Sequence, residues 1–212
     1  MAVADTLEIP TMVIPADALD PGTADLVINR VVQQWGGIDA LVVNAGEGVS
    51  APIHRTDDAL WQYMIDLNLS APFRFLRAAI PVMKKQGFGR IVVIASVASK
   101  VGAPYISAYT AAKHGVLGLV RSAALEVAPF GVTVNAVCPG YVDTPMTRRT
   151  IDTIVAKTGR DPDAVMQTLA QEQGHGKLIE PHEVAAAVRF LIDDLGAING
   201  QGITLDGGKV HI

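Results

Sequence analysis

The chain has 212 residues, of which half are apolar, with a formal net charge of −4 and a single cysteine, Cys138. This length suits one domain with a substantial core, the acidic balance argues against a nucleic-acid partner, and no apolar run is long enough to cross a membrane. One cysteine excludes an internal disulfide, and the first ten residues do not resemble a secretory signal peptide. We therefore expect a cytoplasmic protein.

In the first half of the chain, short apolar runs alternate with segments whose apolar residues have the spacing of a helix. Residues 11–16 predict a short buried strand, and residues 24–35 predict a helix that ends at two glycines. Residues 38–44 predict a strand too uniformly apolar to have one solvated face. Residues 57–86 then predict a long helical region, in which Pro72 and Pro81 mark bends or first-turn positions.

The second half continues the alternation. Strands are predicted over residues 90–96, 133–138 and 202–205, and helices over residues 107–128 and 181–194. The polar region between residues 144 and 180 predicts short helices that cover the substrate as a lid. Uniformly apolar strands between helices are typical of a parallel sheet covered on both faces. The predicted fold is therefore an α/β, doubly wound, Rossmann-like domain spanning residues 1–212.

The most informative chemistry lies between residues 90 and 125. Tyr109 and Lys113 stand four residues apart on a predicted helix, which places them on one face. A neighbouring ammonium favours the phenolate, so Lys113 is expected to lower the pKa of Tyr109 towards the working range of a general acid–base. Ser96 ends a predicted strand, where its hydroxyl is suited to bind a carbonyl oxygen as charge develops on it.

The pair alone is a weak signal, because an amphipathic helix often carries a half-buried tyrosine and a solvated lysine at this spacing. Other motifs occur in order along the chain, and with them the sequence resembles the short-chain dehydrogenase/reductase family from about residue 17 to residue 208. The matching pieces are Asn44-Ala45-Gly46, Asn68, Ser96, Tyr109 with Lys113, residues 139–144 from Pro139 to Thr144, and residues 205–208 near the C-terminus.

The resemblance implies roles for these residues. Tyr109 would be the catalytic acid–base, Lys113 would lower its pKa and bind the nicotinamide ribose, Ser96 would polarise the carbonyl, and Asn68 would hold a water in a proton relay. It also implies a set of cofactor-binding positions: Asp17, Asn44, Ala45, Gly46, Tyr109, Lys113, Pro139, Gly140, Val142 and Thr144. Several have a structural alternative: a turn or helix-capping acid for Asp17, a buried amide bonded to helix backbone for Asn68, a strand-ending turn for Asn44-Ala45-Gly46, and an ordinary loop threonine for Thr144.

The sequence departs from the family at its start. Members normally begin with a strand, a glycine-rich turn, a helix and a second strand, which hold the pyrophosphate and select NAD or NADP. This sequence enters the pattern near the third strand, so the expected fold is truncated at the N-terminus and the cofactor is NAD or NADP without a preference. Loss of a central strand is expected to expose backbone and apolar surface and to favour association.

The substrate region is similar to that of (R)-3-hydroxybutyrate dehydrogenases, but four of its polar positions are not matched. Gly48, Ala98, Ile106 and Thr150 stand where we expect Gln, His, Lys and Gln. We therefore favour a neutral ketone or a 3-oxoacyl thioester over a free hydroxy acid. Arg148 and Arg149 either meet carrier or coenzyme A phosphates or are two solvated arginines on the lid.

Two functional hypotheses follow. The first is an NAD(P)-dependent oxidoreductase that interconverts a secondary alcohol and a ketone, with a 3-hydroxyacyl and 3-oxoacyl thioester pair as the candidate substrates. The second is an inactive assembly partner that binds no cofactor. The resemblance implies a homodimer or homotetramer that forms through the helices around residues 61–83 and 108–127. The five histidines lack the spacing of a metal site, so no metal is predicted.

Overall fold

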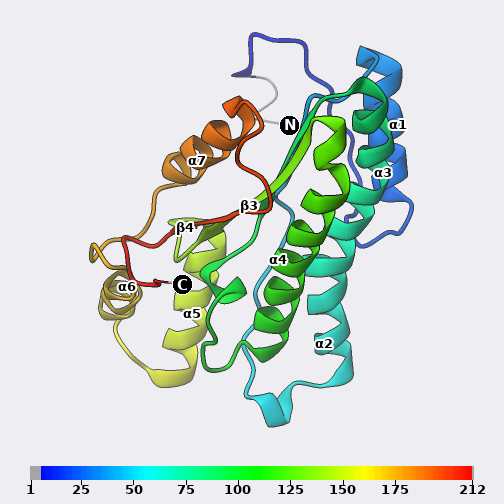
Figure 1. The fold of residues 1–212 in the computed structure, drawn as a ribbon. Helices are drawn as coiled ribbons and strands as arrows, with labels where there is room; N and C mark the ends of the chain where they lie inside the picture. Colours follow the sequence, from blue (N-terminus) through cyan, green and yellow to red (C-terminus); the bar gives the residue numbers. More distant parts are fainter. Residues whose placement is uncertain (1–5, 212) are drawn as a thin grey trace.

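The computed structural model describes residues 6–211, and within them four parallel strands form one sheet in the order β1-β2-β3-β4 (Figure 1). The strands are β1 (Ala40–Val43), β2 (Gly89–Ile94), β3 (Val132–Pro139) and β4 (Gly202–Leu205). They lie where the apolar runs at residues 38–44, 90–96, 133–138 and 202–205 predict them. The predicted parallel α/β fold is therefore confirmed.

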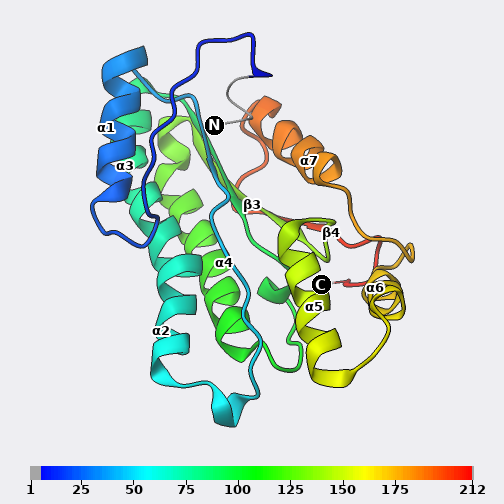
Figure 2. The ribbon, with the colours of Figure 1, turned by 180° about the vertical axis from the view of Figure 1, so that it is seen from behind.

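The helices follow the predicted periodicity. They are α1 (Thr23–Trp35), α2 (Asp58–Ile65), α3 (Ala71–Gln86), α4 (Ser107–Val127), α5 (Pro145–Thr158), α6 (Pro162–Gln171) and α7 (Pro181–Asp193). Figures 1 and 2 show α1, α3 and α4 on one side of the sheet and α7 on the other. Both faces of the sheet are therefore covered, as uniformly apolar strands require.

Successive side chains of β2 point to opposite faces of the sheet and so contribute to the core on both faces. Ile91 and Val93 point into the larger cluster with helices α1, α3 and α4, whereas Val92 packs with Leu191 of α7. All three β2 residues are almost fully buried. This alternation holds the carboxyl end of β2 between two helical layers, and that end is where Ser96 follows.

The predicted helical region at residues 57–86 is one rod with an irregular centre. Asp57 caps α2 by accepting a 2.8 Å hydrogen bond from the Leu60 amide. Between α2 and α3 the chain makes a π-helical turn, η3 (Asp66–Ser70), in which Ala71 N–H donates to the Asp66 carbonyl. Pro72 has no N–H to donate to the carbonyl four residues earlier, and the wider turn accommodates that loss.

The strand predicted over residues 11–16 is wrong. The structure gives this segment no secondary structure, and Val13 is 52% exposed. Its apolar composition is typical of a strand, but a strand needs a neighbour whose backbone groups it can bond, and the described part of the chain supplies none beside it. Pro15 also lacks an N–H for such a ladder.

Two helices occupy most of the region that the sequence predicts to be a lid. Thr144 caps α5 through the Thr147 amide, and Asp161 caps α6 through the Ala164 amide at 3.0 Å. The two helices pack through a small cluster of their own, with Ile151, Val165 and Leu169 buried. They therefore form a separate layer beyond the carboxyl end of β3, as Figures 1 and 2 show.

Candidate active site

Ser96 lies just beyond the carboxyl end of β2 and begins the short 3-10 helix η4 (Val97–Ser99). Its Oγ accepts a 3.1 Å hydrogen bond from the Ala98 amide, and its own N–H donates to Ser99 Oγ at 3.3 Å. This reciprocal cap fixes the backbone of Ser96. Because the Oγ is used there as an acceptor, its proton is available to a third group, and the Ser96 hydroxyl is near enough to Tyr109 to lower the pKa of the phenol.

Tyr109 and Lys113 lie on the same face of α4, as their spacing predicts. The Lys113 side chain is buried, and its Nζ donates a 2.9 Å hydrogen bond to the Ile94 carbonyl at the end of β2. The same nitrogen lies 5.6 Å from the centroid of the Tyr109 ring. The end of β2 thus brings Ser96, Tyr109 and Lys113 together.

The expected direction of the Tyr109 pKa is wrong. Desolvation raises the pKa of the phenol, and the Ser96 hydroxyl only partly opposes this. The Lys113 ammonium is itself desolvated, which lowers its pKa to about 8. Burial therefore dominates both pKa values, and both groups favour their neutral forms relative to water.

Asn68 is fully buried in the π-helical turn and binds the loop that follows β1. Its Nδ2 donates to the Glu47 carbonyl at 2.9 Å and to the Met64 carbonyl at 3.1 Å, while its Oδ1 accepts from the Glu47 amide at 3.3 Å. Asn68 is thus a buried amide bonded to helix backbone, the structural alternative given above, because its Nδ2 donates to the Met64 carbonyl. It also does more, since it holds the backbone of a residue beside the catalytic candidates.

The absence of a side chain at Gly46 lets the loop after β1 lie close to Asn68 and Lys113. A Cβ on Gly46 would lie 2.9 Å from Asn68 Oδ1 and 3.5 Å from Lys113 Nζ, whereas a Cβ on Gly48 would lie 3.7 Å from the Tyr109 ring. The loop after β1 therefore touches Asn68, Lys113 and Tyr109 within three residues. A side chain at Gly46 would displace the Asn68 amide.

The remaining cofactor-binding candidates, apart from Asp17, lie at or after the carboxyl ends of β1 and β3. Asn44 follows β1 and lines an apolar cavity of about 320 Å³ with Val42, Ile94 and residues of α7. Ala45, next to Asn44, is exposed. A crevice at the carboxyl ends of parallel strands is the usual place for a nucleotide in this class of fold.

The loop after β3 carries four of the predicted positions. Pro139 ends β3, and Gly140 N–H donates to the Leu205 carbonyl at 2.8 Å. A Cβ on Gly140 would collide with the carboxamide of Gln173, a buried side chain that the sequence did not single out. Val142 forms an isolated parallel bridge with Ile179, and Thr144 caps α5. These bonds fix the loop to β4, to the segment before α7 and to the start of α5.

Asp17 lies apart from this cluster in the turn before α1. Its Oδ1 accepts a 2.9 Å hydrogen bond from the Leu19 amide, and its carbonyl accepts from Thr23 Oγ1 at 2.5 Å. The structure thus realises the turn interpretation of Asp17, whose side chain is exposed. Its role at the adenine end of a cofactor stays a prediction.

Glu47 is the functional candidate that the sequence analysis missed. Its Oε2 accepts a 2.7 Å hydrogen bond from the Tyr63 hydroxyl, and its Oε1 lies 3.6 Å from Nη2 of Arg149 on α5. The bond to Glu47 is the largest cause of the raised pKa of Tyr63. A carboxylate directly after Asn-Ala-Gly was the available signal, but nothing in its spacing pointed to a partner on α5.

Tyr109 and Lys113 offer a hydroxyl and an ammonium that suit the ribose of a dinucleotide. The apolar cavity beside Val42 and Ile94 is lined by neither Tyr109 nor Lys113, and its other walls are Asn44 and residues of α7. The described residues hold no glycine-rich turn for the pyrophosphate. No group of three metal-ligating side chains occurs among residues 6–211, and no helix in this range is long and apolar enough to cross a membrane.

Comparison with known proteins agrees with this geometry. Residues 2–209 match the family model described as Enoyl-(Acyl carrier protein) reductase. The D-beta-hydroxybutyrate dehydrogenase of Rhizobium meliloti (strain 1021) is 40% identical over 92% of this chain and 76% of its own length. The 3-oxoacyl-(acyl-carrier-protein) reductase of Thermotoga maritima is 36% identical over 87% of this chain and 71% of its own length.

A solved structure, levodione reductase, matches with a TM-score of 0.88 at 30% identity, covering 98% of this chain and 80% of that one. The match includes the sheet and the helices on both of its faces. The fold, the family model and these relatives agree, and the chain belongs to the short-chain dehydrogenase/reductase family.

Proposed function

We propose that the protein is an NAD(P)-dependent oxidoreductase that interconverts a secondary alcohol and a ketone, with a 3-hydroxyacyl and 3-oxoacyl thioester pair as its substrate class. The observation that carries the proposal is the convergence of Ser96, Tyr109 and Lys113 at the carboxyl end of β2. The name of one relative, a 3-oxoacyl-(acyl-carrier-protein) reductase, supports the thioester class, whereas that of another, a hydroxybutyrate dehydrogenase, supports only the 3-hydroxy and 3-oxo pair.

In the proposed reaction a bound nicotinamide supplies or accepts the hydride. Tyr109 donates its phenolic proton to the carbonyl oxygen during reduction and takes it back during oxidation. Its raised pKa keeps the phenol protonated at neutral pH, which suits the reducing direction. The Ser96 hydroxyl donates a hydrogen bond to the same oxygen, where negative charge develops.

The other residues hold these two in place. Lys113, fixed by the Ile94 carbonyl, would bind the ribose and replenish the Tyr109 proton. Asn68 positions the loop after β1 through the Glu47 backbone, and we assign it the proton relay as well. Further candidates for the cofactor are Asp17, Asn44, Ala45, Gly46, Pro139, Gly140, Val142 and Thr144.

Calorimetric titration with NADH and, separately, NADPH tests the cofactor step first. Micromolar binding of either, followed by reduction of a 3-oxobutanoyl thioester, is the expected result. The Tyr109→Phe variant should keep its fold and cofactor affinity and lose activity by about two to four orders of magnitude. Full activity of that variant would remove Tyr109 from the mechanism.

The rival proposal is an inactive assembly partner, and one observation favours it. The outer edge of β1 has no neighbouring strand among the described residues, and Val42 is 42% exposed there. Such an edge is a template for association. A folded sample that binds neither nucleotide up to millimolar concentration would favour this rival. Either function is compatible with the proposed homodimer or homotetramer.

A further inference from the structure

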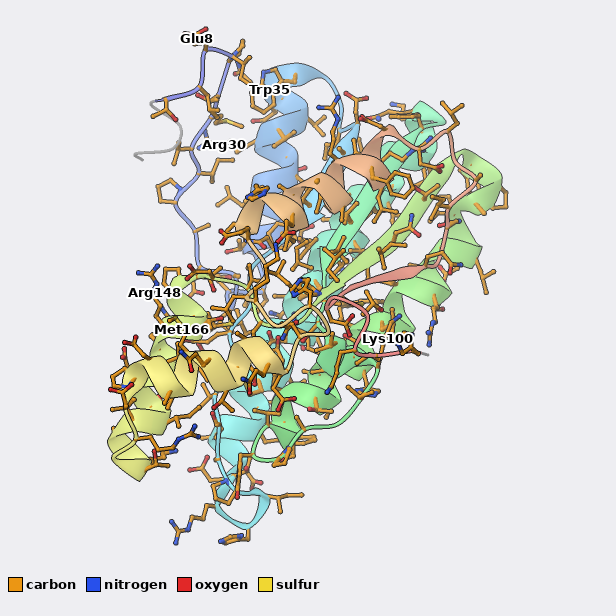
Figure 3. All side chains as sticks on the ribbon, turned by 90° about the vertical axis from the view of Figure 1, so that its left-hand side faces the viewer. Glu8, Arg30, Trp35, Lys100, Arg148 and Met166 are labelled. Atoms are coloured by element: carbon orange, nitrogen blue, oxygen red, sulfur yellow. The ribbon has the colours of Figure 1, made fainter. Side chains whose placement is uncertain are left out.

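The two adjacent arginines of α5 differ in where their carboxylate partners come from. Nη2 of Arg148 lies 3.3 Å from Asp143 Oδ1, just before α5, and Nη2 of Arg149 lies 3.6 Å from Glu47 Oε1, in the loop after β1. Arg148 is on the outer side of α5 in Figure 3. Only the second pair connects α5 with the loop that touches the catalytic candidates.

Glu47 is held at the site by its backbone as well as by its carboxylate. The buried Asn68 amide binds both its N–H and its carbonyl, and its neighbours Gly46 and Gly48 lie against Lys113 and Tyr109. The Tyr63 hydroxyl of α2 orients the carboxylate by donating a hydrogen bond to it. The carboxylate is partly exposed, but these bonds hold it in one position beside the loop that touches Lys113 and Tyr109.

We propose that Glu47 is a specificity-determining residue, whose carboxylate neutralises Arg149 and so disfavours substrates that carry a free carboxylate. This inference rests on the proposed function and refines its substrate class. Both α5 arginines already have carboxylate partners, so an incoming carboxylate finds no unpaired guanidinium there and meets the negative charge of Glu47. A neutral ester or thioester carries no such penalty.

Four variants and one pair of substrates test the inference. The quantity measured is the ratio of kcat/KM for 3-oxobutanoate to that for its methyl ester. Glu47→Gln keeps an acceptor for Tyr63 and frees Arg149, so the ratio should rise at least about threefold, the scale expected for removing one partly screened charge. Arg149→Gln should lower the ratio, and the double variant should return it close to the wild-type value.

Asp193→Asn is the matched control, because it removes the carboxylate of another exposed ion pair, with Arg189 on α7, and should leave the ratio unchanged. An unchanged ratio in Glu47→Gln, or an equal gain in kcat/KM for acid and ester, would overturn the inference. Turnover of either compound would still support the proposed function. Calorimetric Kd values for the same two compounds give the ratio independently of turnover. If the wild type turns over neither compound, a Glu47-dependent Kd ratio supports the inference alone, and binding of neither overturns both.

Discussion

Replacing Lys113 with methionine should stabilise the folded protein at neutral pH. Desolvation lowers the pKa of this buried lysine from 10.5 to about 8, and at about 1.4 kcal/mol per pH unit the charged form costs about 3 kcal/mol on folding. Methionine removes this cost and fills a similar volume, but it leaves the Ile94 carbonyl without its donor, which costs about 1 kcal/mol. The expected net gain is about 2 kcal/mol at pH 7.

The sign of the pH dependence follows from the same shift. Between pH 8 and 10.5 the unfolded chain holds a proton on Lys113 that the folded chain has lost, so the stability of the wild type rises with pH across this window. The cost of about 3 kcal/mol at pH 7 falls to about 1 kcal/mol at pH 9.5. The advantage of Lys113→Met should therefore nearly vanish at pH 9.5.

Urea unfolding followed by circular dichroism at pH 7.0 and 9.5 measures both quantities. Lys85→Met is the control, because Lys85 is exposed at the end of α3 and should change neither the stability nor its pH dependence. If Lys113→Met is less stable than the wild type at pH 7, or if its advantage is the same at both pH values, the desolvation argument is refuted. The variant should also be inactive, because methionine has no ammonium with which to bind the ribose or replenish the Tyr109 proton. A residue kept for function can lower the stability of the fold.

Three further predictions concern the site, and a fourth concerns the predicted subunit interface. Gly46→Ala should lower kcat/KM at least about tenfold, because its Cβ would push against Asn68 Oδ1 at 2.9 Å, whereas Gly48→Ala, with an ordinary 3.7 Å contact, should change it less than about threefold. Asn68→Ala should lower the free energy of unfolding by about 2–4 kcal/mol, since it removes three hydrogen bonds of a fully buried amide, and a change below about 1 kcal/mol in urea unfolding would contradict this. Initial rates of ketone reduction should fall as pH rises above about 8, where Lys113 loses its charge; a profile flat to pH 10 would show that the charge is not needed. Phe73→Glu should shift the mass measured by light scattering towards the monomer, because the exposed Phe73 lies on the predicted interface helix α3, and an unchanged mass would place the interface elsewhere.

The strands, the helices and the pairing of Tyr109 with Lys113 could be predicted because each depends on local periodicity. Three features could not. The segment at residues 11–16 has strand composition, yet a strand requires a partner, which is a tertiary property. The pKa of Tyr109 depends on how deeply the phenol is desolvated, and spacing alone does not reveal that. The contact of Glu47 with Arg149 joins residues about a hundred positions apart through the placement of α5, which no local pattern encodes.

The π-helical turn has a consequence for how α2 and α3 share one side. Met64 and Met83 are both fully buried, yet they stand 19 residues apart, which on a regular helix leaves them about 100° out of phase. The wider turn absorbs one residue and brings the two back into phase. Deleting Leu67 would therefore let a regular helix form with its apolar face intact, while the Asn68 amide would lose the geometry that grips Glu47. The extra residue in the turn is therefore not needed for packing the two helices on one side, and it serves the geometry of Asn68.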